Sequence, residues 1–319
     1  TCTDTGCIPT KTYIESINLL GKINAAKRFG IDTGKPSLSL DSLNTRKIRV
    51  VKRLVKGIEY LLKGADIDIY NQPADIIEQG KVSVGEQHLG ARAVIVATGS
   101  RPKRPSLFDL PGIWTSDTLF DVKDLPETLA IVGGGVIGME MAHIFNSLRS
   151  TATIIEAMER ILPFEDPRVS DLITKNSRSV NIYPSSRVTG VVGNAPYTLA
   201  MDTPEGDADI TAEKILLCIG REPVIPPGLK NLEISLNDAR GIQVDDTMQT
   251  SIPGVYAVGD VTGEYMYAYV ASKEAETAID HLTGKSSKIR YRNIPSIIFT
   301  SPEIASVGKG IEEIDHSTM

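Results

Sequence analysis

Apolar residues recur at helical spacing in the first part of the chain. Between Pro9 and Phe29 they stand three or four positions apart, the pattern of a helix with one buried face. These positions are Tyr13, Ile14, Ile17, Leu20 and Ile23. Pro9 suits a first turn and Gly30 suits a helix end. The pattern therefore predicts a helix over residues 9–29.

A second helix is predicted from Asp41, as its N-cap, to Lys63, with Gly64 after it. Its apolar side consists of Ile48, Val51, Val55, Ile58 and Leu62. Its basic side consists of Arg46, Lys47, Arg49, Lys52, Arg53 and Lys56. A basic side of this kind is a solvated helix face more often than an anion-binding surface, and we expect the former.

The rest of the chain alternates strand-length apolar runs with helical patterns. Strands are expected at "IDIY", "DIIEQ", "KVSVG" and "ARAVIVATG", followed by a proline-rich linker over 101–127. A strand–helix–strand pattern begins at Thr128, and more strands follow at "VNIY", "TGVVG" and "KILLCIG". The segment "IPGVYAVGDVTG" precedes a helix over 270–281, and "IIFTSPEIASVG" reads as a strand that turns. This alternation predicts an α/β fold with a parallel sheet.

Composition and charge narrow the function classes. The chain has 319 residues, is 41% hydrophobic and carries a formal net charge of −6. That length suffices for two domains or more. The acidic balance argues against nucleic acid or an anionic membrane as the main partner. No apolar run approaches the roughly 18 residues of a membrane helix.

The stretch "AIVGGGVIGME" contains Gly133, Gly135 and Gly138 in G-x-G-x-x-G spacing. It follows a predicted strand and opens a predicted helix, which is the context of a dinucleotide fingerprint. Gly133 permits the tight turn, Gly135 a close approach to a pyrophosphate, and Gly138 close helix packing. Glu156 ends the next predicted strand, 18 residues after Gly138. Its carboxylate favours the ribose hydroxyls of NAD and would repel the 2′-phosphate of NADP.

Cys2 and Cys7 enclose four residues at the start of the chain and leave three readings open: a structural staple, half of a metal site, or a redox pair. Zinc would need two more ligands. The third cysteine, Cys218, stands alone in an apolar strand, where we expect it to be a small core side chain. Cys7 at a helix start would have a stabilised thiolate, which favours the redox reading.

Six ordered motifs then identify a resemblance over essentially the whole chain. "TCTDTGCIPTK", "IVATGSRP", "IVGGGVIGME", "IGREP", "TSIPGVYAVGDVTG" and "SPEIASVG" resemble the pyridine nucleotide–disulfide oxidoreductases. Within that family, "GCIPTK" and "EAMERILP" are most similar to its dihydrolipoyl dehydrogenase branch. The resemblance implies FAD and NAD as cofactors and no metal.

The resemblance also implies roles for individual residues. Cys2 would exchange with the substrate disulfide, and Cys7 would face the flavin as the charge-transfer thiolate. Lys11, paired with Glu140, would lie near flavin N5, and Asp260 would bind the ribityl chain. The other implied cofactor-binding residues are Thr98, Gly99, Gly133, Gly135, Gly138, Glu156 and Gly220.

The implied reaction oxidises dihydrolipoamide with NAD⁺ through the Cys2–Cys7 disulfide and FAD. A mercuric or glutathione-type reductase and a non-catalytic NAD-binding fragment remain as alternatives. The implied partners are a free or protein-bound lipoyl group, from 2-oxo acid dehydrogenase complexes or the glycine cleavage system, and a second subunit of a homodimer. A cytoplasmic location is expected.

The resemblance implies a Rossmann-like NAD domain inserted in an incomplete FAD-binding domain. The expected domains are FAD-binding over 1–125, NAD-binding over 126–221, a returning FAD or central domain over 222–289, and the start of a dimerisation domain over 290–319. The chain departs from the family in lacking a first FAD-binding G-x-G-x-x-G and a His followed five residues later by Glu. None of the four histidines, His88, His143, His281 and His316, has a Glu at that spacing. We therefore expect an internal fragment of a longer protein, whose catalytic base lies elsewhere.

Overall fold

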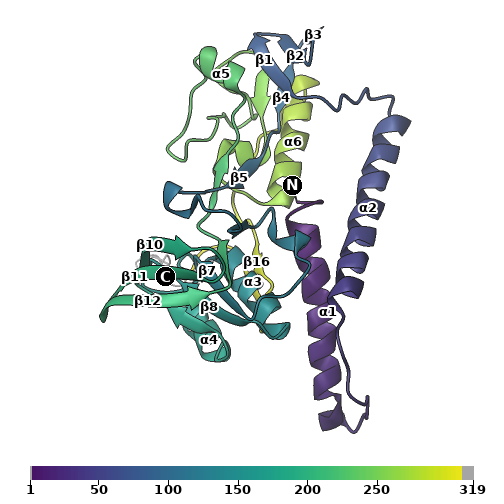
Figure 1. Cartoon of the computed structure of the whole chain (residues 1–319). Helices are drawn as coiled ribbons and strands as arrows, with labels where there is room; N and C mark the ends of the chain where they lie inside the picture. The colour runs from purple at the N-terminus through teal and green to yellow at the C-terminus, as the bar shows by residue number, and fades with distance from the viewer. Residues whose placement is uncertain (1, 311–319) are drawn as a thin grey trace, which may run out of the picture. The chain divides into compact units, whose positions relative to one another are not determined.

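The computed structural model describes residues 2–310 (Figure 1). It divides into two compact units. Unit 1 comprises residues 1–60, 102–220 and 295–319, and unit 2 comprises residues 61–101 and 221–294. The chain therefore passes from unit 1 into unit 2 and back twice. Each unit is described by itself.

Unit 1 is built on a five-stranded parallel sheet in the order β6-β13-β7-β8-β9. Its strands are β6 (Trp114–Thr115), β7 (Thr128–Val132), β8 (Thr151–Ile155), β9 (Asn181–Tyr183) and β13 (Lys214–Leu217). Helix α3 (Val136–Ser147) connects β7 to β8, so the predicted strand–helix–strand unit is present. The register pairs Val132 with both Ile155 and Leu217.

Both faces of this sheet are covered, as a central parallel sheet requires. Leu129 and Ile131 of β7 pack into a core shared with α1 and α3, whereas Ala130 and Val132 pack into a second core. An antiparallel sheet in the order β10-β11-β12 supplies the second core. Its strands are β10 (Arg187–Gly193), β11 (Tyr197–Thr203) and β12 (Gly206–Ala212). The glycine loop thus follows a strand that is packed on both faces of the sheet.

The N-terminal helix α1 (Cys7–Ala25) continues as the short 3-10 helix η1 (Ala26–Phe29) and ends at Gly30. Gly30 has a φ of +77°, the left-handed conformation that glycine adopts without strain. Tyr13 packs on Phe120 with ring centroids 5.1 Å apart. This helix therefore starts at the second cysteine and is held to unit 1 by its buried side.

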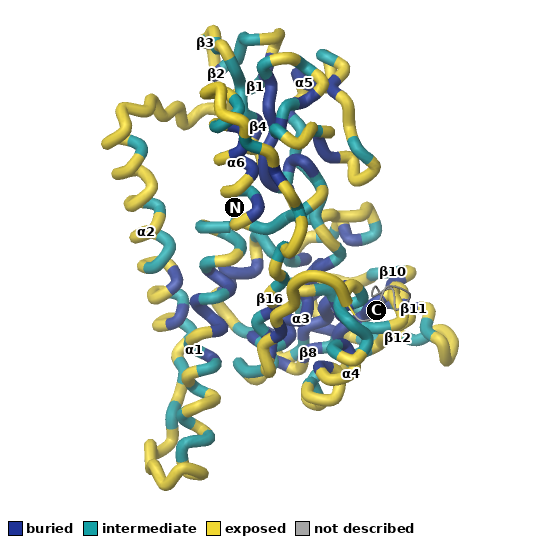
Figure 2. The backbone as a smooth tube through the Cα atoms, turned by 180° about the vertical axis from the view of Figure 1, so that it is seen from behind, coloured by how far each residue is buried: buried dark blue, intermediate teal, exposed yellow. Residues whose placement is uncertain are grey.

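Helix α2 (Leu40–Gly64) matches the predicted helix, but three of its predicted details are wrong. The capping side chain is Ser39, whose hydroxyl accepts the Ser42 N–H, and Asp41 lies inside the first turn. Lys47, expected on a solvated face, is buried and donates to the Phe120 carbonyl at 2.6 Å. Ile48 and Ile58 of the expected apolar face are exposed, and α2 is drawn mostly as exposed and intermediate in Figure 2.

The remaining elements of unit 1 are short. The helices are α4 (Pro167–Asn176) and the 3-10 helices η2 (Ser106–Phe108) and η3 (Leu119–Asp121). The antiparallel pair β16 (Ser296–Ile298) and β17 (Ile304–Ser306) brings the last described part of the chain back to the α1–α3 core.

Unit 2 is organised around the parallel pair β4 (Val94–Val96) and β15 (Val255–Ala257). Val96 and Ala257 face one core, and Ile95 and Tyr256 face another, which includes α6 (Ala268–Leu282). The 3-10 helix η4 (Gly259–Thr262) connects β15 to α6. The other elements are β1 (Ala74–Glu78), β2 (Lys81–Val84), β3 (Gln87–Gly90), β5 (Ser100–Pro102), β14 (Arg221–Pro223) and α5 (Pro227–Asn231).

Two sequence-based predictions of local structure need correction, and several elements were not predicted. The "IDIY" segment is not a strand: Ile67 and Ile69 are exposed and pair with no described strand. The predicted linker over 101–127 contributes β6 to the edge of the parallel sheet. The sequence reading also missed β11, β12 and α4, because polar residues interrupt their apolar patterns.

Candidate active site

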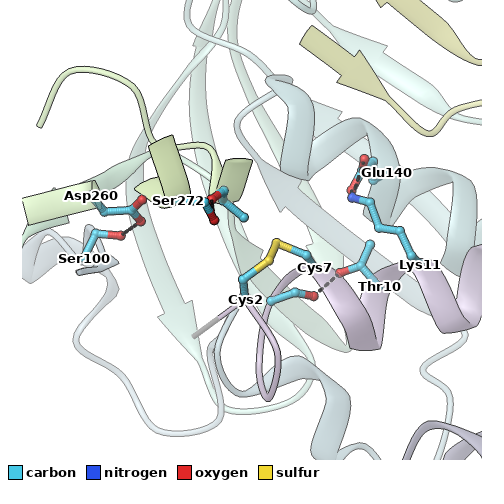
Figure 3. Close-up of a disulfide and its surroundings, with 10 residues drawn as sticks. Cys2, Cys7, Thr10, Lys11, Ser100, Glu140, Asp260 and Ser272 are labelled. Atoms are coloured by element: carbon cyan, nitrogen blue, oxygen red, sulfur yellow. Dashed lines mark hydrogen bonds and ion pairs between the residues drawn. A yellow bond between two sulfur atoms is a disulfide. The ribbon is translucent and has the colours of Figure 1, made fainter. Parts of the chain in front are cut away.

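The two N-terminal cysteines form a disulfide at the start of α1. Cys2 and Cys7 are bonded, with Cα atoms 4.6 Å apart. Cys7 is the first residue of the helix, and the Ile8 N–H donates to the Cys2 carbonyl at 2.9 Å. Cys7 is exposed and Cys2 is half-buried, so the bond is open to a thiol in solution. The predicted bridging and helix start are confirmed (Figure 3).

An ion pair joins α1 to α3 one helical turn beyond the disulfide. Lys11 Nζ lies 2.9 Å from both carboxylate oxygens of Glu140. The Glu140 side chain is 4% exposed, whereas that of Lys11 is 35% exposed. Lys11 and Cys7 are four residues apart on one helix, so they share a face. The structure thus places a positive group beside the disulfide, anchored by a buried carboxylate.

The glycine loop has the backbone geometry of a phosphate cradle. A Cβ on Gly133 would lie 2.4 Å from the Cys218 carbonyl oxygen, and one on Gly138 would lie 2.0 Å from the Gly133 oxygen. Both positions therefore exclude any larger residue. A Cβ on Gly135, the N-cap of α3, would meet nothing within 4 Å. The space beside Gly135 is thus open at the end of a helix whose N–H groups are free to bind an anion.

Glu156 follows β8, and its carboxylate is hydrogen-bonded to the backbone of the glycine loop. Its carboxylate accepts the Gly134 N–H at 2.6 Å and the Met158 N–H at 2.7 Å. The residue is buried. A carboxylate offers about four acceptor positions, so capacity remains for ribose hydroxyls.

In unit 2, Asp260 lies in η4 directly after Gly259. Its carboxylate accepts the Ser100 hydroxyl at 2.5 Å, and the Arg221 Nε–H donates to the same hydroxyl oxygen at 2.7 Å. Gly99 has a φ of +70° and its carbonyl accepts the Val224 N–H. Thr98 is exposed and donates to the Val224 carbonyl. Thr98, Gly99 and Asp260 therefore belong to one unit.

Sequence reasoning missed Glu274, a fully buried carboxylate of α6. Its side chain accepts the Gly259 N–H at 2.5 Å and the Tyr291 hydroxyl at 2.9 Å. Burial raises the pKa of Glu274 above its ordinary value, and the nearby charges of Glu264 and Asp260 act in the same direction. No sequence signal could have found it, because a Glu in a helix is ordinarily exposed.

Other predicted residues lie apart from these clusters or outside the described part. Gly220 is exposed, with a φ of +98°, and its carbonyl accepts the Lys103 N–H. Cys218 is a buried member of the unit 1 core, as predicted, and burial raises its pKa. His143 contacts Asn18 at 3.2 Å, and burial lowers its pKa. His316 lies outside the described residues.

Within residues 2–310, no group of three or more His, Cys, Asp or Glu side chains is arranged to hold a metal ion. In the same range, no helix is both long and apolar enough to cross a bilayer.

A disulfide at a helix start and a G-x-G-x-x-G loop between a strand and a helix are the features expected of a nucleotide-dependent thiol–disulfide oxidoreductase. The chain belongs to the pyridine nucleotide-disulphide oxidoreductase family, which matches residues 1–275. A dihydrolipoyl dehydrogenase of Bacillus subtilis is 35% identical over 319 residues, covering 97% of this chain and 69% of the relative. One from Acholeplasma laidlawii is 36% identical over 290 residues, covering 88% and 85%.

Solved structures of similar fold include a flavoprotein disulfide reductase. LpdA from Mycobacterium tuberculosis has a TM-score of 0.90 at 26% identity, covering 99% of this chain and 72% of that protein. The Cu(II) complex of RclA, an HOCl-induced flavoprotein disulfide reductase from Escherichia coli, has a TM-score of 0.85 at 26% identity. It covers 98% of this chain and 70% of that protein. Family membership implies FAD and NAD(H) as cofactors.

The residues present fit these cofactors to different extents. For NAD(H), the open space beside Gly135 and the unused acceptor capacity of Glu156 fit a pyrophosphate and a ribose. For FAD, the half-buried carboxylate of Asp260 fits a polyol, because it retains acceptor positions beyond its bond with Ser100. The sequence contains one G-x-G-x-x-G, so the fit to FAD concerns the ribityl and isoalloxazine side.

Proposed function

We propose that the protein is an NAD-dependent dihydrolipoyl dehydrogenase that oxidises dihydrolipoamide to lipoamide through the Cys2–Cys7 disulfide. The observation that carries the proposal is the solvent-open disulfide at the first residue of α1. The support for this substrate is the identity of 31–36% to dihydrolipoyl dehydrogenases.

The proposed thiol chemistry uses both sulfurs in sequence. A thiolate of dihydrolipoamide attacks Cys2, a mixed disulfide forms, and the Cys2–Cys7 bond breaks with Cys7 leaving as a thiolate. The second substrate thiol, as thiolate, then attacks the mixed disulfide and releases lipoamide and the Cys2 thiolate, which takes up a proton. The substrate loses two electrons, and the protein disulfide gains them. The N-terminus of α1 stabilises the departing Cys7 thiolate.

Bound FAD would accept the electron pair from the dithiol and deliver it as hydride to NAD⁺. The chain's own residues orient and charge that site. Lys11, paired with Glu140, would supply a positive group to the flavin, and Asp260 would bind the ribityl hydroxyls. Gly133, Gly135, Gly138 and Glu156 hold NAD. Thr98, Gly99 and Gly220 are the further residues proposed to contribute to cofactor binding.

The domain roles follow from this assignment and are part of the proposal. Residues 126–221 form the NAD-binding domain, and residues 1–125 with 222–289 form the FAD side. The compact units of the structure group residues 1–60 with 102–220. Their boundaries therefore differ from those of the proposed cofactor-binding domains. Residues 290–319 begin a dimerisation domain, with a homodimer and a lipoyl-bearing protein as partners.

The test is a substrate panel on the FAD-loaded protein that carries this chain together with the catalytic base expected outside it. We expect NADH formation from dihydrolipoamide and NAD⁺, much less with NADP⁺, and none for Cys2→Ser. Faster reduction of glutathione disulfide or mercuric ion would instead assign the reaction to those relatives. Binding of NADH without flavin uptake or thiol exchange would support a non-catalytic NAD-binding protein.

A further inference from the structure

Phe299, in the turn that follows β16, contacts both members of the Lys11–Glu140 pair. Lys11 Nζ lies 4.6 Å from the centroid of the Phe299 ring. The Phe299 N–H donates to Glu140 Oε1 at 3.1 Å. One residue thus binds the ammonium through its side chain and the carboxylate through its backbone.

The contact with the ring adds what the ion pair alone lacks. Lys11 has a long side chain that is 35% exposed, so its contact with one carboxylate does not by itself fix the direction from which the side chain reaches Glu140. A ring face within about 6 Å attracts a cation and fixes the side from which it approaches. The ring and the carboxylate together hold the ammonium at two points, whereas water would otherwise compete for its N–H groups.

Phe299 is itself held firmly by its neighbours. Ile298, the residue before it, is fully buried in the core that contains α1 and α3. Ile298 pairs with Ile304 across β16 and β17. Thr300, the residue after it, is buried, and its hydroxyl donates to the Pro302 carbonyl at 2.7 Å. The turn can therefore act as a rigid support rather than a loose covering.

We propose that Phe299 is a positioning residue that fixes the Lys11 ammonium through its ring and the Glu140 carboxylate through its N–H. This inference deepens the proposed function and rests on it for the role of Lys11. Phe299 acts through Lys11 and touches no reacting atom. The segment over 296–300, distant in sequence from the disulfide, thereby sets the electrostatics of the site that α1 and α3 carry.

The first experiment needs neither cofactor nor turnover. The purified chain is acylated with a trace of isotopically labelled acetic anhydride, and the rate at Lys11 relative to exposed lysines is read by mass spectrometry. Phe299→Leu keeps the N–H and removes the ring, so we expect Lys11 to react about threefold faster. Phe299→Tyr keeps a ring face and should remain at the parental rate. Phe299→Met, of similar volume, should match Phe299→Leu.

The matched control is Phe164→Leu, since Phe164 is a phenylalanine of the same unit with 94% of its surface exposed. It should leave the Lys11 rate unchanged. In a Glu140→Gln background the ammonium has already lost its anchor, so Phe299→Leu should add little, and the two effects should be non-additive. An unchanged rate in both Phe299→Leu and Phe299→Met, or full additivity with Glu140→Gln, would overturn the proposal.

A second readout separates this inference from the proposed function. In the FAD-loaded protein, Phe299→Leu should lower the rate of flavin reduction by dihydrolipoamide and leave NADH affinity unchanged, with Phe299→Tyr restoring the rate. If the parental protein shows no dihydrolipoamide activity, the proposed function fails, and the acylation result alone decides the positioning role. If NADH affinity falls instead of the reduction rate, Phe299 does not act through Lys11.

Discussion

At the scale of single residues, the site depends on buried carboxylates whose oxygens are occupied by backbone N–H groups. Glu140, Glu156 and Glu274 each accept at least one main-chain N–H. A buried carboxylate is costly unless it is hydrogen-bonded, so each marks a place where the backbone must be held. Glu156 binds the N–H of Gly134, next in sequence to Gly135, and Glu274 binds the N–H of Gly259, next in sequence to Asp260.

Glu274→Gln should change how stability depends on pH. The pKa of Glu274 is raised in the folded protein, chiefly by burial, so the native state keeps this proton to higher pH than the unfolded state. The parental chain should therefore lose stability as pH rises from about 4.5 through the raised value. The Gln variant has no such proton and should lack this loss. Urea unfolding between pH 4 and pH 8 measures it, and parallel curves would contradict the assignment.

Glu156→Ala should weaken NADH binding more than NADPH binding. The substitution removes the acceptor for ribose hydroxyls and also frees the Gly134 and Met158 N–H groups. Hydrogen bonds to a charged group are worth about 1.5–3 kcal/mol, so we expect about a tenfold or greater loss for NADH. Fluorescence titration with both nucleotides measures the ratio. Equal losses would show that Glu156 only supports the loop.

At the scale of elements, the β7–α3–β8 unit separates packing from ligand binding within one loop. A Cβ on Gly138 would collide with the carbonyl of Gly133, the residue that follows β7. A Cβ on Gly135 would point into open space. Two glycines of one motif thus carry different physical demands. Gly138 is required by close backbone packing, whereas Gly135 leaves space that a ligand can occupy.

Paired alanine substitutions should show that separation. Gly138→Ala places a Cβ 2.0 Å from a backbone oxygen and should destabilise unit 1 by about 1–3 kcal/mol. Gly135→Ala should preserve stability and weaken NADH binding, because its Cβ would enter the phosphate space. Thermal unfolding and NADH titration of both variants give the comparison. A stable Gly138→Ala chain, or unimpaired NADH binding by Gly135→Ala, would be the contrary result.

At the scale of the whole molecule, each unit has its own pair of cores. The cores of unit 1 lie on the two faces of the five-stranded sheet, and those of unit 2 lie on the two faces of the β4–β15 pair. The disulfide and the glycine loop belong to unit 1, and Asp260 belongs to unit 2. Unfolding of either unit can therefore be followed by a probe inside it.

Cysteine labelling should follow unit 1. After mild reduction, the native chain should take up two alkylating groups, at Cys2 and Cys7, because Cys218 is buried and burial raises its pKa. A third group should appear only as denaturant unfolds the unit. Mass spectrometry across a urea series counts the groups, and circular dichroism on the same samples is the control. Three groups on the native chain would contradict the burial of Cys218.

The sequence alone determined the parts whose cause is local. The spacing of Gly133, Gly135 and Gly138 predicts a strand–turn–helix unit. The Gly-Cys-Ile-Pro run predicts a helix start close in sequence to a second cysteine. Helix spacing gave α1 and α2 to within a few residues. These features follow from backbone sterics and side-chain periodicity, which neighbouring residues fix.

Only the tertiary structure decided which distant residues meet. The sequence predicts Lys47 as a solvated surface charge, but the fold buries it against the Phe120 carbonyl. The sequence predicts Ile48 as a core residue, but it is exposed on α2. Glu274 and Phe299 carry no motif, and their roles arise from Gly259, Tyr291, Lys11 and Glu140, which the fold brings beside them. Burial and long-range pairing depend on the whole packing arrangement, so no local pattern could have specified them.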